Sequence, residues 1–432
     1  MRYIFMNNFR GFEDTLIPLR QTTFLVGENS TGKSSFLKLV YLMSQPGFWF
    51  RPEFAIQEET DLGGFRDIVS AGSPNRSFFQ IGVLTTTKNK KTDALKCSFS
   101  VHSFIEKDGA AIVSRYLQCA DEQIITLLLQ PKKTRYKTET IEKTFGSEDE
   151  IISFFRDVAL RNVTDDDGLQ DFPRNLPPDP PLPVAVGIVR TIDKKEKVSG
   201  REFTAEIPFA FNLTWIAPIR TKPQRFYDGT KRSFSPEGDH TPFILRQSLT
   251  ARSKSKEFAE KIQEFGQASG LFETVIPHTF GSSSQAPFEI LIRLKGAELN
   301  MNNVGYGISQ VLPLIVEFLS GEKKQYFAVQ QPEVHLHPRA QAALGDLIFE
   351  LAKEKQHSFL LETHSDYLID RYRLRMHDDN GSSHAQVVFF HRFEKGNRAD
   401  VLVIEPDGKY PSHQPPAFRD FFVREEVRLL EV

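Results

Sequence analysis

The sequence has few cysteines, little net charge and no long apolar run. Only Cys97 and Cys119 occur, and neither lies in a CxxC or Cys/His cluster, which argues against a disulfide framework and against structural zinc. The formal net charge of -2 gives no global basic field for nucleic acid, although a local basic patch stays open. No apolar run approaches the roughly 20 residues that a membrane span needs. Charged residues interrupt the N-terminus, unlike a signal peptide, so we expect a cytoplasmic protein without a membrane partner.

The remaining pattern predicts an α/β protein with a β-rich first part. The chain has 432 residues, of which 40% are hydrophobic, and this suffices for a large core and for two or three domains. Apolar runs broken by charged turns predict several strands over residues 50–140, and a Pro- and Asp-rich stretch predicts a loop or linker at 165–183. Elsewhere the periodicity predicts helices over 149–161, 256–269, 308–320, 338–355 and 365–376, strands at 326–330 and 358–362, a hairpin at 288–300 and a C-terminal helix.

One loop carries a strong phosphate-binding pattern. GENSTGKS, Gly27 to Ser34, matches G-x-x-x-x-G-K-[ST] between a predicted strand and a predicted helix. Glycines let consecutive N–H groups curl around phosphate oxygens, and the helix points its positive end at the same group. Lys33 should reach the β- and γ-phosphates, and Ser34 should coordinate Mg²⁺. The strand–loop–helix context distinguishes this loop from a Gly/Ser-rich turn that matches by chance. The candidate ATP-binding residues are Gly27, Asn29, Ser30, Thr31, Gly32, Lys33, Ser34 and Ser35.

Two further segments have features of a nucleotide site. A predicted helix begins among Gly305, Gly307 and Ser309, and the N-terminus of a helix suits an anion. The same residues would also fit a flexible turn. The strand at 358–362 is followed by Thr363 and His364. An imidazole there can contact a γ-phosphate or orient water, but a single histidine can equally be structural.

The stretch YFAVQQPEVHLHP poses a chemical question. Its apolar strand resembles the metal-binding strand of a nucleotide hydrolase, yet Gln330 and Gln331 stand where acids are expected. An amide can hydrogen-bond to water, but it cannot accept a proton or supply charge to Mg²⁺.

The order of these segments resembles ABC-type ATPase heads. The closest likeness is to the OLD/RecF-like group, the AAA family ATPases of the AAA15/AAA21 type. The segments that carry the resemblance are the P-loop, the Gly-rich segment, QPEVHLHP and ETHS, with NNFRGFEDTLIPL, DLGGFRDIV, WIAPIRTKPQRFY and PAFRDFFVREEVRLL. These matches cover nearly the whole chain.

The resemblance implies a fold and a role for each site residue. We expect an α/β ABC-type P-loop ATPase head with an N-terminal β-rich lobe and a helical or insertion lobe. Its expected parts are residues 1–70 with the P-loop, residues 71–300 with the insertion, and residues 301–432 with the signature, the metal-binding strand and the switch histidine. Gly305, Gly307 and Ser309 would form a signature that closes on ATP of another subunit, and His364 would be the switch histidine. Arg220 would be a phosphate sensor or interface residue, with a surface ion pair as the alternative.

The resemblance also makes Gln330 the main departure. Related proteins have an acid there as metal ligand or activator of water, whereas Glu333 and the HLHP that follow are kept. Gln330 is therefore the candidate catalytic and metal position, with Glu333 and His364 as the other catalytic candidates. Three explanations are open: a Glu-to-Gln variant that traps the ATP state, which we favour, a natural weak hydrolase in which Glu333 takes over, and a nucleotide-gated scaffold.

The implied function is an ATP-dependent assembly. Two heads would pair head to tail around ATP and Mg²⁺, or form larger oligomers. OLD nucleases carry a nuclease domain after the head, and the few residues after His364 cannot hold one. We therefore expect a separate nuclease or toxin effector and a phage protein or DNA as trigger, as in antiphage systems such as PARIS and Septu. The basic runs at 88–91 and 131–137 are candidate recognition surfaces or merely solvated loops. The alternative function is a RecF/SMC-like ATPase that clamps DNA during repair.

Overall fold

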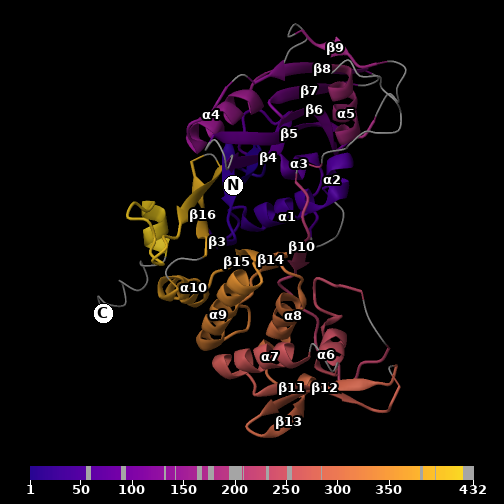
Figure 1. Cartoon of the computed structure of the whole chain (residues 1–432), viewed down its shortest axis with the longest axis vertical. Helices are drawn as coiled ribbons and strands as arrows, with labels where there is room; N and C mark the ends of the chain where they lie inside the picture. The colour runs from indigo at the N-terminus through magenta and orange to yellow at the C-terminus, as the bar shows by residue number, and fades with distance from the viewer. Residues whose placement is uncertain are drawn as a thin grey trace. The chain divides into compact units, whose positions relative to one another are not determined.

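The computed structural model divides the chain into two compact units. The first comprises Met1–Leu19, Glu28–Asn212 and Phe390–Ala399, and the second Arg20–Gly27, Leu213–Phe389 and Asp400–Val432 (Figure 1). The three-part division at residues 70 and 300 stays a prediction. The structure describes residues 1–54, 60–88, 94–130, 133–141, 143–162, 168–173, 180–193, 207, 209–229, 233–250, 255–283, 285–379, 383–394 and 396–421.

An eight-stranded antiparallel sheet forms the frame of the first unit. Its strand order is β2-β1-β4-β5-β6-β7-β8-β9. Buried and exposed residues alternate along parts of these strands, as expected where each face of the sheet packs against a different layer. The strands are β1 (Arg2–Asn7), β2 (Thr15–Leu19), β4 (Phe78–Lys88), β5 (Leu95–Lys107), β6 (Ala110–Ala120), β7 (Gln123–Gln130), β8 (Lys133–Thr140) and β9 (Gln170–Asp171).

Each face of this sheet carries one amphipathic helix. α4 (Glu148–Ala159) packs Phe155 between Phe5 and Phe99 of one face. Ser147 caps this helix, because its side chain accepts a hydrogen bond from the N–H of Glu150. α5 (Leu182–Asp193) covers the opposite face in a cluster that includes Tyr116 and Leu127.

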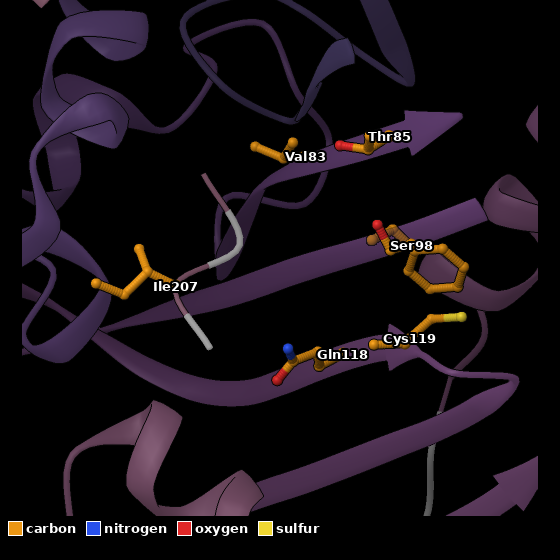
Figure 2. A pocket seen from close by; sticks show the side chains of 8 residues that line it. Val83, Thr85, Ser98, Gln118, Cys119 and Ile207 are labelled. Carbon is orange, nitrogen blue, oxygen red and sulfur yellow. The ribbon is translucent and has the colours of Figure 1, made fainter. Parts of the chain in front are cut away.

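A cavity of about 440 Å³ opens on the sheet of the first unit. Figure 2 shows side chains of three neighbouring strands around it, with Ile207 facing them from another segment. None of its lining residues carries a charge; they are Val83, Thr85, Ser98, Phe99, Gln118, Cys119, Ala120 and Ile207. Further along β5, the His102 ring is fully buried among aromatic rings, and burial lowers its pKa to about 3.

Three helices come early in the sequence of the first unit: α1 (Lys33–Ser44), α2 (Pro46–Phe50) and α3 (Phe65–Ile68). α1 buries an apolar face that includes Phe36 and Leu37. The indole N–H of Trp49 donates to the carbonyl of Met43 at 2.7 Å, which fixes α2 against the end of α1.

A six-stranded sheet organises the second unit, in the order β10-β14-β15-β3-β16-β17. The neighbours β10, β14, β15 and β3 pair in parallel. Their central residues are buried, as expected for parallel strands covered on both faces, and they read as short apolar runs. The strands are β3 (Thr22–Gly27), β10 (Leu213–Ile216), β14 (Tyr326–Gln330), β15 (Ser358–Glu362), β16 (Ala385–Phe393) and β17 (Gly396–Val403).

Helices build the rest of the second unit around one core. Figure 1 shows α8 (Tyr306–Ser320) and α9 (Pro338–Glu354) beside this sheet, and α6 and α7 between them and a small antiparallel sheet. The rings of Phe318, Phe327 and Phe359 meet in the core between helix and sheet. The remaining elements are α6 (Thr241–Thr250), α7 (Ser255–Ser269), α10 (Asp366–Asp378), β11 (Thr274–Thr279), β12 (Phe288–Leu294), β13 (Ala297–Asn300) and a 3-10 turn at Met301–Asn303.

The α/β class with a β-rich N-terminal lobe is confirmed, and most predicted elements are present. The strands at 326–330 and 358–362 have the predicted bounds, and the predicted hairpin turns at Lys295 and Gly296, both with positive φ. Within the predicted linker, Gln170–Asp171 pairs with β8 and Leu182 already begins α5, while positions 165–167 and 174–179 lie outside the described residues.

Other predictions are only partly covered. Residues 416–421 are helical, and the rest of the predicted C-terminal helix lies outside the described residues. The same holds for positions 89–91 and 131–132 of the two basic runs. In the second run Lys133 pairs with Asp171 at 2.9 Å. Within the described part of the chain, no helix is both long and apolar enough to cross a membrane.

Candidate functional site

The P-loop runs from a buried strand into a helix. β3 is buried along its whole length, and α1 begins at Lys33 with Gly32 as its N-cap. Gly27, Ser30 and Gly32 have φ values of 134°, 61° and 95°. Left-handed residues of this kind turn successive N–H groups toward one side, as a cradle for an anion requires.

Gly32 is required by both its backbone and its surroundings. A Cβ at this position would lie 2.5 Å from Cε2 of Phe12, whose ring closes the space behind the loop. Among the described residues, no side chain caps the start of α1. The first-turn N–H groups of a helix have no intrahelical partner, so this start suits phosphate oxygens.

Hydrogen bonds hold several side chains of the P-loop in place. Lys33 is only 4% exposed, and its Nζ donates to the carbonyl of Glu28 at 2.6 Å. The hydroxyl of the buried Thr31 donates to the same carbonyl at 2.7 Å. Arg10 donates to the Ser35 hydroxyl at 3.0 Å, and burial lowers the pKa of its guanidinium. The lysine therefore lies folded along the loop, next to the N–H groups that would bind phosphate.

In the second unit, the carboxyl ends of three parallel strands meet at one edge of the sheet. β14 ends at Gln330, β15 at Glu362 and β3 at Gly27, the first P-loop residue. Gln330 is the direct register partner of Glu362, and Glu362 is the partner of Leu25. The edge just beyond the carboxyl ends of parallel strands is where α/β proteins bind ligands.

The turn after β14 is organised by Glu333. Its carboxylate accepts a hydrogen bond from the Thr363 hydroxyl at 2.8 Å and another from the His364 N–H at 2.7 Å. Burial, the largest effect, raises the pKa of Glu333. Glu333 thus fixes the backbone before the exposed His364 ring, and both of its oxygens are used for this purpose.

Arg220 is buried beside the same turn. It is 1% exposed, which rules out the surface ion pair, and its Nη2 donates to the Gln330 carbonyl at 3.4 Å. Burial lowers its pKa to about 10, and the charge of Glu333 opposes that shift. Its Nε and Nη1 have no hydrogen-bond partner among the described residues. A buried guanidinium with unused donors favours an anionic ligand.

The Gly-rich segment forms the start of α8. Gly305 is its exposed N-cap, and α8 begins at Tyr306, two residues before the predicted start. A Cβ on Gly307 would lie 2.7 Å from the carbonyl of His335, so this glycine permits the helix to approach the turn. Ser309 is only 5% exposed, and its hydroxyl donates to the carbonyl of Tyr306 at 2.8 Å. The exposed part of the segment is therefore its backbone at Gly305 and the ring of Tyr306.

The HLHP sequence is explained by helix capping and contact with this segment. His337 is the N-cap of α9, and its ring accepts a hydrogen bond from the N–H of Ala340, while Pro338 occupies the first helical turn. The His335 ring meets the ring of Tyr306 edge-on, with centroids 4.8 Å apart. The structure thus brings the Gly-rich segment and the turn after β14 together within the second unit.

Two charged residues near the predicted site were not singled out from the sequence. Arg10 lies in the quoted N-terminal match, but only the fold places it under Ser35. Glu362 precedes the predicted Thr363–His364 pair and is 4% exposed. Glu362 is the register partner of Gln330, and strand register cannot be deduced from a local sequence pattern.

The residues present fit the phosphates of a nucleotide. In the first unit, the positive φ of Ser30 and Gly32 suits a cradle of N–H groups for phosphate. In the second unit, Arg220 has two donor nitrogens without a hydrogen-bond partner among the described residues. The described residues contain no group of three or more His, Cys, Asp or Glu that could hold a metal alone.

Comparisons with known proteins agree with the P-loop assignment. A family model described as an AAA ATPase domain matches residues 1–172 and 224–369. No curated protein matches the chain.

Solved structures with a detectable likeness include an Smc head bound to the C-winged helix domain of ScpA, with 14% identity over 93% of this chain and 98% of that one and a TM-score of 0.40. Another is the Pyrococcus furiosus Smc head with an extended coiled coil, with 12% identity over 99% and 100% and a TM-score of 0.40. The recombination mediator RecF gives 11% identity over 89% and 95%, with a TM-score of 0.31.

The family model covers well over half of the sequence, and the matched ranges include Gly27–Ser34, Gly305–Ser309 and His364. The predicted α/β class and the ATPase domain are confirmed, and the ABC type of the head stays a prediction. The chain belongs to the AAA ATPase domain family.

Proposed function

We propose that this protein binds ATP with Mg²⁺ and uses the bound nucleotide mainly as a slow switch. The observation that carries the proposal is the P-loop, where Gly32 admits no side chain and Lys33 lies folded beside the uncapped start of α1. Lys33 would exchange the Glu28 carbonyl for the β- and γ-phosphates, and Ser34 would hold Mg²⁺, which would supply positive charge to the phosphates.

Slow hydrolysis follows from the chemistry at the end of β14. The amides of Gln330 and Gln331 can orient water but cannot take its proton. Glu333 is engaged with Thr363 and His364, so its role is to position the switch loop. Losing a general base typically costs ~10²–10⁴ in rate, so we expect a long-lived ATP state.

The second half of the proposal is head-to-tail assembly. The exposed start of α8 at Gly305 and Tyr306 is a second helix N-terminus suited to an anion. In a pair of chains, this segment of one subunit closes over the ATP of the other. The ATP-bound state then holds the pair together, and hydrolysis releases it.

The biological role that we propose is control of a separate effector, a nuclease or toxin, in defence against phage. A phage protein or phage DNA is the trigger. The RecF/SMC-like alternative differs in one measurable way, because clamping DNA through phosphate contacts gives affinity that falls steeply with salt. The acids paired with basic residues of β8 favour the first role, since Lys133 and Lys137 have Asp171 and Glu139 beside them.

Nucleotide binding is tested by Lys33→Ala in titration calorimetry with ATP and Mg²⁺. We expect binding to be lost, because the variant removes the phosphate-binding cation and leaves the loop backbone in place. Lys38→Ala, which changes a half-buried lysine on the same helix, is the matched control and should bind normally. An unchanged affinity for Lys33→Ala would refute the assignment of this loop.

A further inference from the structure

The cavity on the eight-stranded sheet is lined by polar side chains that carry no charge. Thr85, Ser98 and Gln118 come from the neighbouring strands β4, β5 and β6, and Ile207 faces them (Figure 2). All of its lining residues belong to the first unit. Its volume of about 440 Å³ lies within the range of roughly 300–1,000 Å³ that is usual for sites of small molecules.

The strand register places these polar side chains on one face of the sheet. Thr85 is the direct partner of Ser98, and Gln118 is the direct partner of Ser100, two residues further along β5. Residues two apart on a strand point to the same side, so all four side chains project from one face. Two residues before Gln118, Tyr116 belongs to the cluster under α5. The cavity therefore lies on the face that α5 covers further along β6.

Two buried polar atoms on this face lack a hydrogen bond. Gln118 is 4% exposed and Ser100 is fully buried. Neither the Oε1 of Gln118 nor the hydroxyl of Ser100 has a hydrogen-bond partner among the described residues. Native proteins rarely leave such atoms unpaired, because burying a polar group without a partner costs free energy. Figure 2 shows Gln118 on the side of β6 where Ile207 lies, and Cys119 on the other side, so the amide of Gln118 is aimed into the cavity.

The lining selects the chemistry of a ligand. Among the described residues, no charged side chain lines the cavity, so none would balance a phosphate, a carboxylate or an ammonium group. The amide of Gln118 holds a donor and an acceptor side by side, and a half-turn about its last bond exchanges the two. Such an amide pairs with two neighbouring polar atoms on the edge of a nucleobase, as glutamine does with adenine. Hydroxyl groups such as those of Thr85 and Ser98 can donate to or accept from a ligand.

We propose that this cavity binds an uncharged nucleobase or nucleoside, with the amide of Gln118 on the edge of the base. The hydroxyls of Thr85 and Ser98 bind other polar atoms of the base or the ribose, and Val83 and Ile207 supply apolar contacts. The ligand provides the hydrogen bond that the Gln118 amide lacks in the described part of the chain. The inference goes beyond the proposed function, because these residues are separate from those of the P-loop.

The test measures binding of four uncharged probes to the full chain. Adenosine, guanosine, cytidine and uridine are each titrated in a calorimeter without ATP, and at least one of them should bind. Gln118→Leu removes the amide at similar size and should weaken that binding about 10- to 100-fold, as expected for a contact with two hydrogen bonds to a base. Gln130→Leu makes the same change at an exposed glutamine of β7 and should leave the affinity unchanged.

A second variant fills the cavity and keeps its polar groups. Ala120 lines the cavity and is half-buried, so Ala120→Leu should be tolerated by the fold and should abolish binding of the same nucleoside. This variant decides the question if Gln118→Leu does not fold. The inference is overturned if none of the four nucleosides binds. It is also overturned if either folded variant binds as tightly as the wild type, since the nucleoside then lies at another site.

Discussion

At the scale of single residues, the acid Glu333 positions a loop, whereas Gln330 supplies no charge at the end of β14. Glu333 accepts hydrogen bonds from Thr363 and His364, so the acid three residues after Gln330 is used to shape the loop that contains them. Arg220, for which the sequence allowed either a sensor or a surface residue, is fully buried, and two of its donor nitrogens have no hydrogen-bond partner in the part of the chain that the structure describes. We propose Gln330 as the residue whose chemistry limits turnover.

Gln330→Glu should raise the rate of ATP hydrolysis by ~10²–10⁴. A carboxylate at the end of β14 can accept the proton of the attacking water, which the amide cannot. The affinity for ATP should change far less, because the restored interaction is made mainly in the transition state. Steady-state phosphate release at saturating ATP measures the effect.

Gln331→Glu is the matched variant for this prediction. Gln331 has a φ of 46° and lies in the turn, while Gln330 is the last residue of the strand. Equal rates for Gln330→Glu and the wild type would mean that another group carries catalysis. A higher rate of ATP hydrolysis seen only with Gln331→Glu would mean that the general base is missing from the turn and not from the end of β14.

At the scale of elements, the start of α8 contacts a neighbouring turn, and this contact requires a glycine. The helix opens against the turn that contains His335, and Gly307 has no room for a Cβ because the His335 carbonyl would be 2.7 Å away. Gly305, two residues earlier, has nothing within 4 Å of a Cβ built on it. The two glycines therefore serve different purposes, one for packing and one for an open helix end.

Gly307→Ala should lower the free energy of unfolding by ~1–3 kcal/mol, the usual cost of overpacking. Chemical denaturation followed by circular dichroism measures the change. Gly305→Ala is the control, and its stability should stay within about 0.5 kcal/mol of the wild type, as for other surface substitutions. Equal stabilities of the two variants would contradict the contact with the His335 carbonyl.

Helices and strands were predicted well from the sequence where a single hydrophobic pattern defines the element. The strands ending at Gln330 and Glu362 have their predicted bounds, because short apolar runs between helices define buried parallel strands. The helix at Leu182–Asp193 was missed, because the prolines around its start suggested a loop. The pairing of Glu362 with Gln330 could not be predicted, since it depends on which strands are neighbours in the sheet and in which register.

At the scale of the whole molecule, the proposal requires two chains for one complete site. One chain contributes the P-loop, and its partner contributes the start of α8 with Gly305 and Tyr306. In a symmetric pair, each chain gives and receives the same contribution, so two ATP molecules lie between the subunits. This arrangement predicts that two different defects, placed on separate chains, can complement each other.

The test combines Lys33→Ala and Gly305→Asp, each made in the faster Gln330→Glu background. Asp is a favoured N-cap, so Gly305→Asp should keep α8 while it places a negative charge where phosphate is to bind. Gly305→Asn, a neutral N-cap of similar size, is the matched control and should remain active. Each defective variant alone should hydrolyse little ATP. An equal mixture should recover about one quarter of the parental rate, because half of the randomly formed pairs are mixed and each has one intact site. A mixture no more active than the average of its two components would show that each chain completes its own site, and head-to-tail assembly would be refuted.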